Sequence, residues 1–430
     1  MVNPVTQSMV DRIIETKYKG KIAELGYGTD TPLWSLIPKR PDFREETLML
    51  RNRYGLNPSG SHTVATARSR QGASSYARFG LTQSKAYGSV AFDGMTARAL
   101  VAGNTQRAID VVSLEVESQA MHFGRRMNRM MYQNHGGSLG IRITSGGNSQ
   151  TLTVYAEHRE RLINVHPGMY LVSSNTDGTS GSVDANPTHV TAVNYEAGTI
   201  TTDATTSWAT AAGGFSNDDY LFPQGAFGSA FYGIDSWVPS TAPSDTFLGQ
   251  SRAANPVLLG GVRYTASAGS PDGTIQRAFS NAAIEGKKWG ARPDVIMMNI
   301  DNFGALTNEI EGRIEYTSAL ARRGGYGEKD AEVDVGILGV RITLPTNPGC
   351  LVVPDNDCPR DVAYMLDFRT IAFHGVGMTE PEWLNPAGTG RWHNMLSDDI
   401  DGMEALMGIY GNLGIESPGC NVRVNIAAVV

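Results

Sequence analysis

The sequence predicts an α+β fold organised around one long helix, and three features of the chain lead to this prediction. Between residues 104 and 134, apolar side chains recur at steps of three and four, which is the periodicity of an amphipathic helix. On both sides of this stretch, short segments alternate between apolar and polar residues, as β-strands do. Charged residues make up only 18% of the chain and glycines number 49, which favours strands and loops over an all-helical protein.

The size of the chain and its cysteines set outer limits on its class. With 430 residues it is long enough for two or three domains with a real core. It has no run of eighteen apolar residues, so we expect no membrane span, and its first residues lack the basic start and apolar core of a secretion signal. Cys350, Cys358 and Cys420 are odd in number and lack Cys-x-x-Cys spacing, which argues for a reducing compartment without disulfides.

The long helix is expected to begin at the cap residues Asn104 and Thr105 and to end at the glycines of residues 134–137. About thirty residues at roughly 1.5 Å each give a rod of about 45 Å, so we interpret the helix as a strut. Gly124 lies mid-helix, where glycine costs roughly 1 kcal/mol relative to alanine, and is a possible hinge; close packing against a neighbouring strand is the alternative. The packing face consists of Ile109, Val112, Val116, Ala120, Phe123, Met127 and Met130.

The segment before the helix is expected to be extended and basic. Residues 1–25 read as a short amphipathic helix, and residues 26–41 read as a stretch that cannot form a core by itself. Residues 47–54 alternate as a strand, residues 55–75 form a tip rich in Gly, Ser, Ala and Arg, and return strands run over 76–92. Few of these residues could bury an apolar face within their own chain, so such a loop must lie on something else.

Charge is distributed unevenly along the chain. Residues 39–98 carry a net +6, residues 1–38 are balanced, and residues 99–430 carry −13. A basic segment could bind nucleic acid, but interleaved stacking aromatics and a recognition helix are missing. We therefore favour the acidic body of another copy of the chain as its partner. The candidate inter-subunit contacts are Arg51, Arg53, Arg68, Arg70, Arg78 and Lys85.

The rest of the chain divides into a β-region and a mixed region. Residues 138–225 read as a small inserted β-barrel or sandwich, with alternation at 151–155 and 189–195 and a hairpin turn at 196–198. From about residue 260 onward, helices flank a sheet. In the β-region, a further strand is expected over residues 199–202. In the mixed region, the expected helices are 272–289 and 302–312, and the expected strands are 295–298, 333–344, 350–354, 362–367, 370–374, 403–413 and 421–427.

We find no motif for catalysis, a cofactor or a metal. The run 355–361 resembles the start of a calcium loop, but Arg360 stands where glycine is required and Leu366 stands where the glutamate should be. The glycine-rich patches lack the features of phosphate or dinucleotide loops, and the eight histidines show no ligand spacing. The sequence therefore predicts no catalytic, cofactor-binding or metal-binding residues and favours a protein that is not an enzyme.

Several local stretches, together with the order of the segments, resemble a known family. The stretches are Gly233-Ile-Asp-Ser-Trp-Val-Pro239, Gly290-Ala-Arg-Pro-Asp-Val-Ile296, Asp357-Cys-Pro-Arg-Asp-Val-Ala-Tyr-Met-Leu-Asp367 and Asp398-Asp-Ile-Asp-Gly-Met-Glu404. They resemble the major capsid proteins of tailed double-stranded DNA bacteriophages, which have the Hong Kong 97-type fold. The resemblance implies hexamers and pentamers in an icosahedral shell around packaged double-stranded DNA.

The resemblance also implies a set of domains. They are an N-terminal arm (1–38), an extended basic loop (39–98), the spine helix of the peripheral domain (99–137), the inserted β-domain (138–225), a peripheral connection (226–254), the axial domain (255–384), a peripheral return strand (385–412) and a final axial strand (413–430).

The resemblance further implies partners and a location. The implied partners are other copies of the chain, a separate scaffolding protein, a portal and decoration proteins, and no membrane is involved. The implied location is the virion, after assembly in the host cytoplasm. The alternatives are an encapsulin-like cargo shell and a hydrolase with a β-accessory domain. Because nothing marks an activating carboxylate near Lys85, we expect a shell without covalent cross-links.

Overall fold

The computed structural model describes residues 31–70, 72–93, 105–145, 150–183, 187–202, 208, 214–311, 340–345, 347, 349–384, 392–394 and 402–430. The chain forms two compact units. Unit 1 comprises Met1–Pro239, Ser244–Ala254 and Arg369–Glu416, and unit 2 comprises Ser240–Pro243, Asn255–Phe368 and Ser417–Val430. The helix expected over residues 1–25, the cap at Asn104 and the strand residues 333–339 lie outside the described residues.

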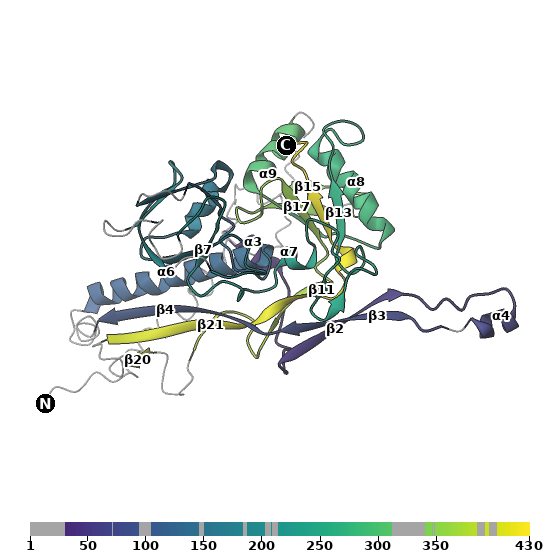
Figure 1. Ribbon diagram of the computed structural model, residues 1–430, viewed down its shortest axis with the longest axis horizontal. Coiled ribbons are helices and arrows are strands. Elements are labelled where there is room, and N and C mark those ends of the chain that lie inside the picture. Colours follow the sequence, from purple (N-terminus) through teal and green to yellow (C-terminus); the bar gives the residue numbers. More distant parts are fainter. Residues whose placement is uncertain are drawn as a thin grey trace, which may run out of the picture. The chain divides into compact units, whose positions relative to one another are not determined.

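The long helix is confirmed and packs on a long sheet in unit 1. Helix α6 runs from Thr105 to Tyr132, and it lies along β4 (Ser84–Asp93) and β21 (Gly402–Ile415), as Figure 1 shows. The two strands pair antiparallel from Asp93–Gly402 to Ser84–Gly411. Helix and sheet approach closely at Gly88, where a Cβ atom would lie 2.2 Å from the side-chain nitrogen of Gln119.

Short strands complete the long sheet on either side of β21. The strand order is β1 (Lys39–Arg40), β18 (Ile371–Gly375), β21 and β19 (Glu382–Trp383), and β20 (Trp392–Asn394) and β4 also pair with β21. Residues 369–384 belong to unit 1, because β18 pairs with β21. The sequence had placed these residues in the expected axial domain, 255–384.

The basic segment forms a two-stranded hairpin. Strand β2 (Thr47–Gly55) pairs antiparallel with β3 (Ser75–Thr82), and the short helix α4 (Val64–Ser69) lies at the tip (Figure 1). The Thr63 side chain accepts a hydrogen bond from the Thr66 amide and so caps α4, which sequence reasoning missed. The expected return strands are present, but β3 belongs to the hairpin whereas β4 belongs to the long sheet.

The inserted region is a closed β-barrel. Its strands are β5 (Ile143–Ser145), β6 (Thr151–Val154), β7 (Tyr170–Ser174), β8 (Thr188–Asn194), β9 (Thr199–Thr202) and β10 (Tyr220–Pro223), and η1 (Ala156–Asn164) follows β6. They are ordered β10-β7-β8-β9-β6-β5, and the bridge between Arg142 and Tyr220 joins the two ends of this sheet. Its buried residues include Leu139, Leu152, Val190, Ile200, Trp208 and Leu221.

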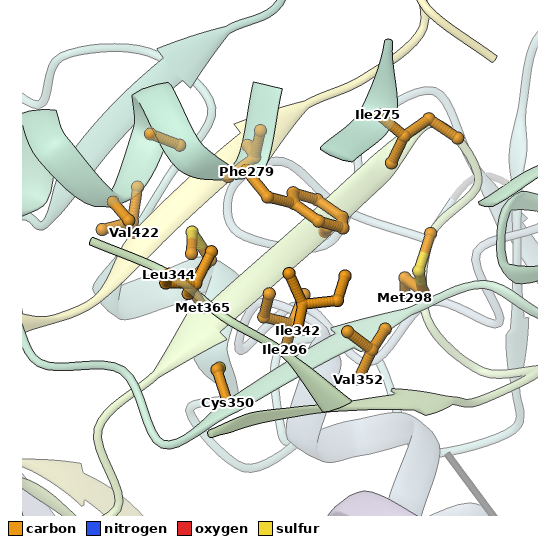
Figure 2. Packing of buried hydrophobic residues seen from close by; sticks show 14 of the residues in the cluster. Ile275, Phe279, Ile296, Met298, Ile342, Leu344, Cys350, Val352, Met365 and Val422 are labelled. Atoms are coloured by element: carbon orange, nitrogen blue, oxygen red, sulfur yellow. The ribbon is translucent and has the colours of Figure 1, made fainter. Parts of the chain in front are cut away.

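Unit 2 is the expected sheet flanked by helices. Its strand order is β13 (Val262–Thr265), β22 (Val422–Asn425), β17 (Val362–Leu366), β14 (Val295–Met298), β16 (Cys350–Pro354) and β15 (Val340–Ile342), with a short turn, η3 (Pro418–Cys420), before β22. Helices α8 (Ile275–Lys288) and α9 (Ile300–Glu311) accompany the sheet. Phe279 of α8 packs against Ile296, Met365 and Val422 of the sheet in the buried cluster of Figure 2.

The start of the described chain contains a helix that the sequence did not predict. Residues 26–41 were expected not to form a core by themselves, and Pro32–Leu36 is a helix, α3, that packs on α6. Its Leu33 and Trp34 are fully buried, and the Trp34 amide donates to the Asn128 side chain of α6 at 3.0 Å. The partner helix lies about ninety residues away in sequence, so local periodicity could not reveal this burial.

Candidate assembly surfaces

The base of the hairpin is fixed by an apolar face on both of its strands. Leu50 of β2 and Phe79 of β3 are directly opposite in the register, and both are buried. The Phe79 ring packs edge-on against Trp237 of α7 (Ile234–Trp237), with centroids 5.3 Å apart. It also contacts Phe247 of the short strand β11 (Thr246–Phe247), which pairs with β12 (Gln250–Ser251). This aromatic cluster anchors the inner face of the hairpin.

Polar contacts fix the same base. The Gly80 amide donates to the Leu248 carbonyl at 2.9 Å, which ties β3 to the turn between β11 and β12. The Asp42 carboxylate lies 2.7 Å from Nδ1 of His374, a buried residue of β18. The Phe43 amide donates to the Gly375 carbonyl at 3.2 Å. The chain that enters β2 is therefore held to the long sheet before the hairpin begins.

The outer face of the hairpin is basic. The register places Arg51 directly opposite Arg78, and Arg53 opposite Tyr76, on the exposed side of both strands. Like charges directly opposite each other destabilise a strand pair. These three arginines form no ion pair with any residue in the described part of the chain. Met49 and Tyr76, which lie on the same face, are 57% and 59% exposed.

The described residues at the tip of the hairpin are exposed or half-buried. From residue 53 to residue 76, no residue that the structure describes is buried. Arg68 and Arg70 are exposed in and just after α4. Leu56 is 76% exposed and Val64 is 73% exposed, which are high values for apolar side chains. The tip is therefore a surface with both apolar and basic character.

Lys85 lies on a different surface from the arginines. It is exposed on β4, opposite Tyr410 of β21, on the side of the long sheet that faces away from α6. Tyr87 lies beside it, and the Tyr87 and Tyr410 rings meet edge-on at 5.8 Å. Burial and the hydrogen bond with Tyr87 raise the pKa of Tyr410 above its ordinary value. Sequence reasoning missed both tyrosines, because their proximity depends on the pairing of β4 with β21.

The residues assigned to the packing face of the strut lie in the core where they are described. Val116, Ala120, Phe123, Met127 and Met130 are all buried. Gly124 is also buried, within an uninterrupted α6. Nothing is described of the side chains of Ile109 and Val112.

The described residues contain no group of side chains that marks a metal site, and the buried thiol of Cys350 is poorly reactive. No group of three or more His, Cys, Asp or Glu side chains there could hold a metal ion, and none of the described helices is long and apolar enough to cross a membrane. Cys350 and Cys358 are buried and form no disulfide, and burial together with the nearby Asp294 charge raises the pKa of Cys350 to about 12. A thiol with so high a pKa is a poor nucleophile at neutral pH.

Comparison with known proteins identifies the class to which this architecture belongs. No protein-family model matches the sequence, and no curated protein matches it. The subunit of the cyanophage A-1(L) capsid matches with 93% of each chain covered, 11% identity and a TM-score of 0.52. The fold is therefore that of phage capsid subunits, the Hong Kong 97-type fold that the sequence predicted.

Two further solved structures resemble the chain more distantly. The match to a chain of the capsid of a native GTA particle covers 93% of this chain and 91% of that chain, with 9% identity and a TM-score of 0.43. The SrpI encapsulin of Synechococcus elongatus PCC 7942 covers 93% and 89%, with 9% identity and a TM-score of 0.40.

Proposed function

We propose that the chain is the major capsid protein of a phage, a structural subunit rather than an enzyme. Copies of it assemble as hexamers and pentamers into an icosahedral shell that encloses double-stranded DNA. The observation that carries this proposal is the hairpin, whose residues 53–76 include no buried residue among those described. Ordering such a segment costs conformational entropy that its own subunit does not offset. A surface on a neighbouring copy would supply the missing burial.

The charge of the hairpin suits a neighbouring copy of the same chain. Arg51, Arg53 and Arg78 present three guanidinium groups on one exposed face, and residues 99–430 carry a net −13. Guanidinium groups can bind carboxylates through two parallel hydrogen bonds, which adds orientation as well as attraction. Met49 and Tyr76 add apolar area to the same contact. The hairpin then acts as a clamp between subunits.

The remaining roles follow from this assembly. Residues 1–38 would be the N-terminal arm, residues 39–98 the extended loop, and residues 99–137 the spine. A separate scaffolding protein, a portal and decoration proteins would be the partners, and DNA would be enclosed without sequence-specific contacts. Assembly would take place in the host cytoplasm, and the mature location would be the virion.

Sedimentation and electron microscopy of the purified chain test the proposal. We expect closed, roughly isometric particles with five-fold and six-fold capsomers, formed by the chain alone or with its scaffolding protein. A monodisperse monomer under every assembly condition, scaffolding protein included, would contradict it. Nuclease-protected double-stranded DNA in particles from infected cells would separate a phage head from a cargo shell, which would contain protein instead.

A further inference from the structure

Both chain connections of the inserted barrel lie near the C-terminal end of α6. The chain enters the barrel just after α6, through Gly136, and leaves it through Gly228. The Gly228 amide donates to the Gly136 carbonyl at 2.9 Å, so the two connections lie side by side. The Asn134 side chain donates to the Asp177 carboxylate at 2.7 Å at the same place. Two adjacent connections form one pivot, and a second contact is needed to set the angle between barrel and helix.

A pair of histidines makes such a second contact. His122 of α6 and His166, which follows η1 in the barrel, meet edge-on with ring centroids 5.3 Å apart and planes at 66°. His122 lies ten residues before Tyr132, the last residue of α6, so the contact is about 15 Å from the pivot along the helix. A contact at this distance from the connections restricts rotation of the barrel about them.

Positive groups surround this pair. Arg125, Arg126 and Arg129 follow His122 at three, four and seven residues, which places them on the same side of α6. In strand β4, the Tyr87 carbonyl accepts a hydrogen bond from the Arg126 side chain at 3.2 Å. On the barrel side, the His166 amide contacts the Met169 sulfur. Among the described residues, the charged groups that influence His122 are His166 and the three arginines, and none of these is a carboxylate.

We propose that the contact between His122 and His166 is an acid-sensitive latch that holds the inserted barrel against α6 at neutral pH and releases it on acidification. This inference concerns the subunit alone and does not depend on shell assembly. The two uncharged rings can pack against each other beside the arginines. Two imidazolium rings at the same distance would repel each other and the three guanidinium groups.

The pKa shifts give the direction and the pH range. Burial and the nearby positive charges lower the pKa of His122 to about 4, and burial and Arg125 and Arg129 lower that of His166. A ring released into water would return to an ordinary pKa of about 6.5. Closure is therefore favoured fully above pH 6.5 and is lost progressively as the pH falls toward 4. From His122 alone, the equilibrium constant for opening should rise about 30-fold between pH 7.5 and pH 5.

Spin-label distance measurements on the unassembled full chain test the latch. One label would replace Ser118 on α6 and the other would replace Ile163 on η1, since both side chains are exposed. Cys420 would be changed to Ser, because it is the only one of the three cysteines that is not buried. We expect a narrow distance distribution at pH 7.5 and a longer, broader one at pH 5.

Substitutions at the latch distinguish this explanation from general acid effects. His122→Phe and His166→Phe, singly and together, keep an aromatic contact but cannot gain a proton, so we expect the double variant to stay narrow at both pH values. His62→Gln, which removes an exposed imidazole from the hairpin, should keep the wild-type response. A distribution unaffected by pH in the native sequence, or a response that survives in the double variant, would overturn the proposal.

A second label pair tests whether the barrel itself unfolds in acid. His158 lies inside the inserted domain, and burial together with Arg161 lowers its pKa to about 4, so acid could also weaken the barrel. Labels at Ile163 and Tyr195, both exposed within the barrel, report on its integrity. Their distance should stay constant between pH 7.5 and pH 5. If it lengthens over the same range, barrel unfolding explains the response and the latch is refuted.

Discussion

Reversing the charge of the hairpin face should weaken assembly without unfolding the subunit. The change is Arg51→Glu, Arg53→Glu and Arg78→Glu together. All three side chains are exposed and have no ion pair in the described part of the chain, so their removal breaks no intramolecular salt bridge there. Arg51 and Arg78 already repel each other across the strands, and two glutamates at these positions would repel by a similar amount. The free energy of unfolding of the subunit should therefore change little.

The effect on the contact between subunits is larger because attraction becomes repulsion. An exposed ion pair is worth roughly 0.2 to 1 kcal/mol, so three pairs contribute at most about 3 kcal/mol for each hairpin. Losing about 3 kcal/mol weakens one contact by roughly 150-fold. Charge reversal also adds repulsion between the subunits, which weakens the contact further. Every copy in a shell repeats the contact, so the yield of particles should collapse. Extending the change to Arg68 and Arg70 should block assembly entirely.

Particle yield by sedimentation, with thermal unfolding of the free subunit, is the assay. A charge-matched control reverses Arg159, Arg277 and Lys287, which are exposed elsewhere in the chain and form no ion pair with described residues. The control changes net charge equally, so its particles should form nearly normally. Normal yield and stability from the hairpin variant would refute the reasoning.

The single change Arg51→Glu should place a carboxylate opposite Arg78, stabilising the subunit by up to about 1 kcal/mol while reducing assembly.

Three further outcomes are expected. Gly124→Ala should stabilise α6 by up to about 1 kcal/mol, and if Gly124 is a bending point it should also impair shell expansion, so normal assembly and expansion would remove the hinge interpretation. Boiled particles on a denaturing gel should run as one band near 46.2 kDa, whereas a ladder of multimers that disappears in Lys85→Ala would reveal a covalent cross-link. Phe279→Ala, in the core of unit 2, should lower the free energy of unfolding in urea by about 3 to 5 kcal/mol, and a loss below 1 kcal/mol would contradict its placement there.

The elements that could be predicted are those defined by local patterns. Helix α6 and strands β14 and β16 match their expected ranges within two residues, because periodicity and bounding turns lie within each segment. The alternation of residues 47–54 likewise predicted strand β2 before any partner strand was known.

Features that depend on distant partners could not be predicted. The burial of Trp34 depends on α6, and the closure of the barrel depends on a bridge between residues 142 and 220. The pairing of Arg51 with Arg78 needed the register of the hairpin, although the basic character of both strands was visible. Histidine spacing gave no hint of His122 beside His166, since they are forty-four positions apart and the barrel strands β5 and β6 lie between them.

Strand β3 of the hairpin and strand β4 of the long sheet are joined by a single residue, and this gives the subunit a mechanical property. Strand β3 ends at Thr82 and β4 begins at Ser84, so only Gln83 lies between them. The Asn412 side chain of β21 donates to the Thr82 carbonyl at 2.9 Å and to the Ser84 hydroxyl at 3.2 Å, which clamps both ends of that link. A connection with so little slack cannot absorb displacement. A displacement of β3 would therefore be passed to β4 and the helix beside it, because Asn412 holds both ends of the link.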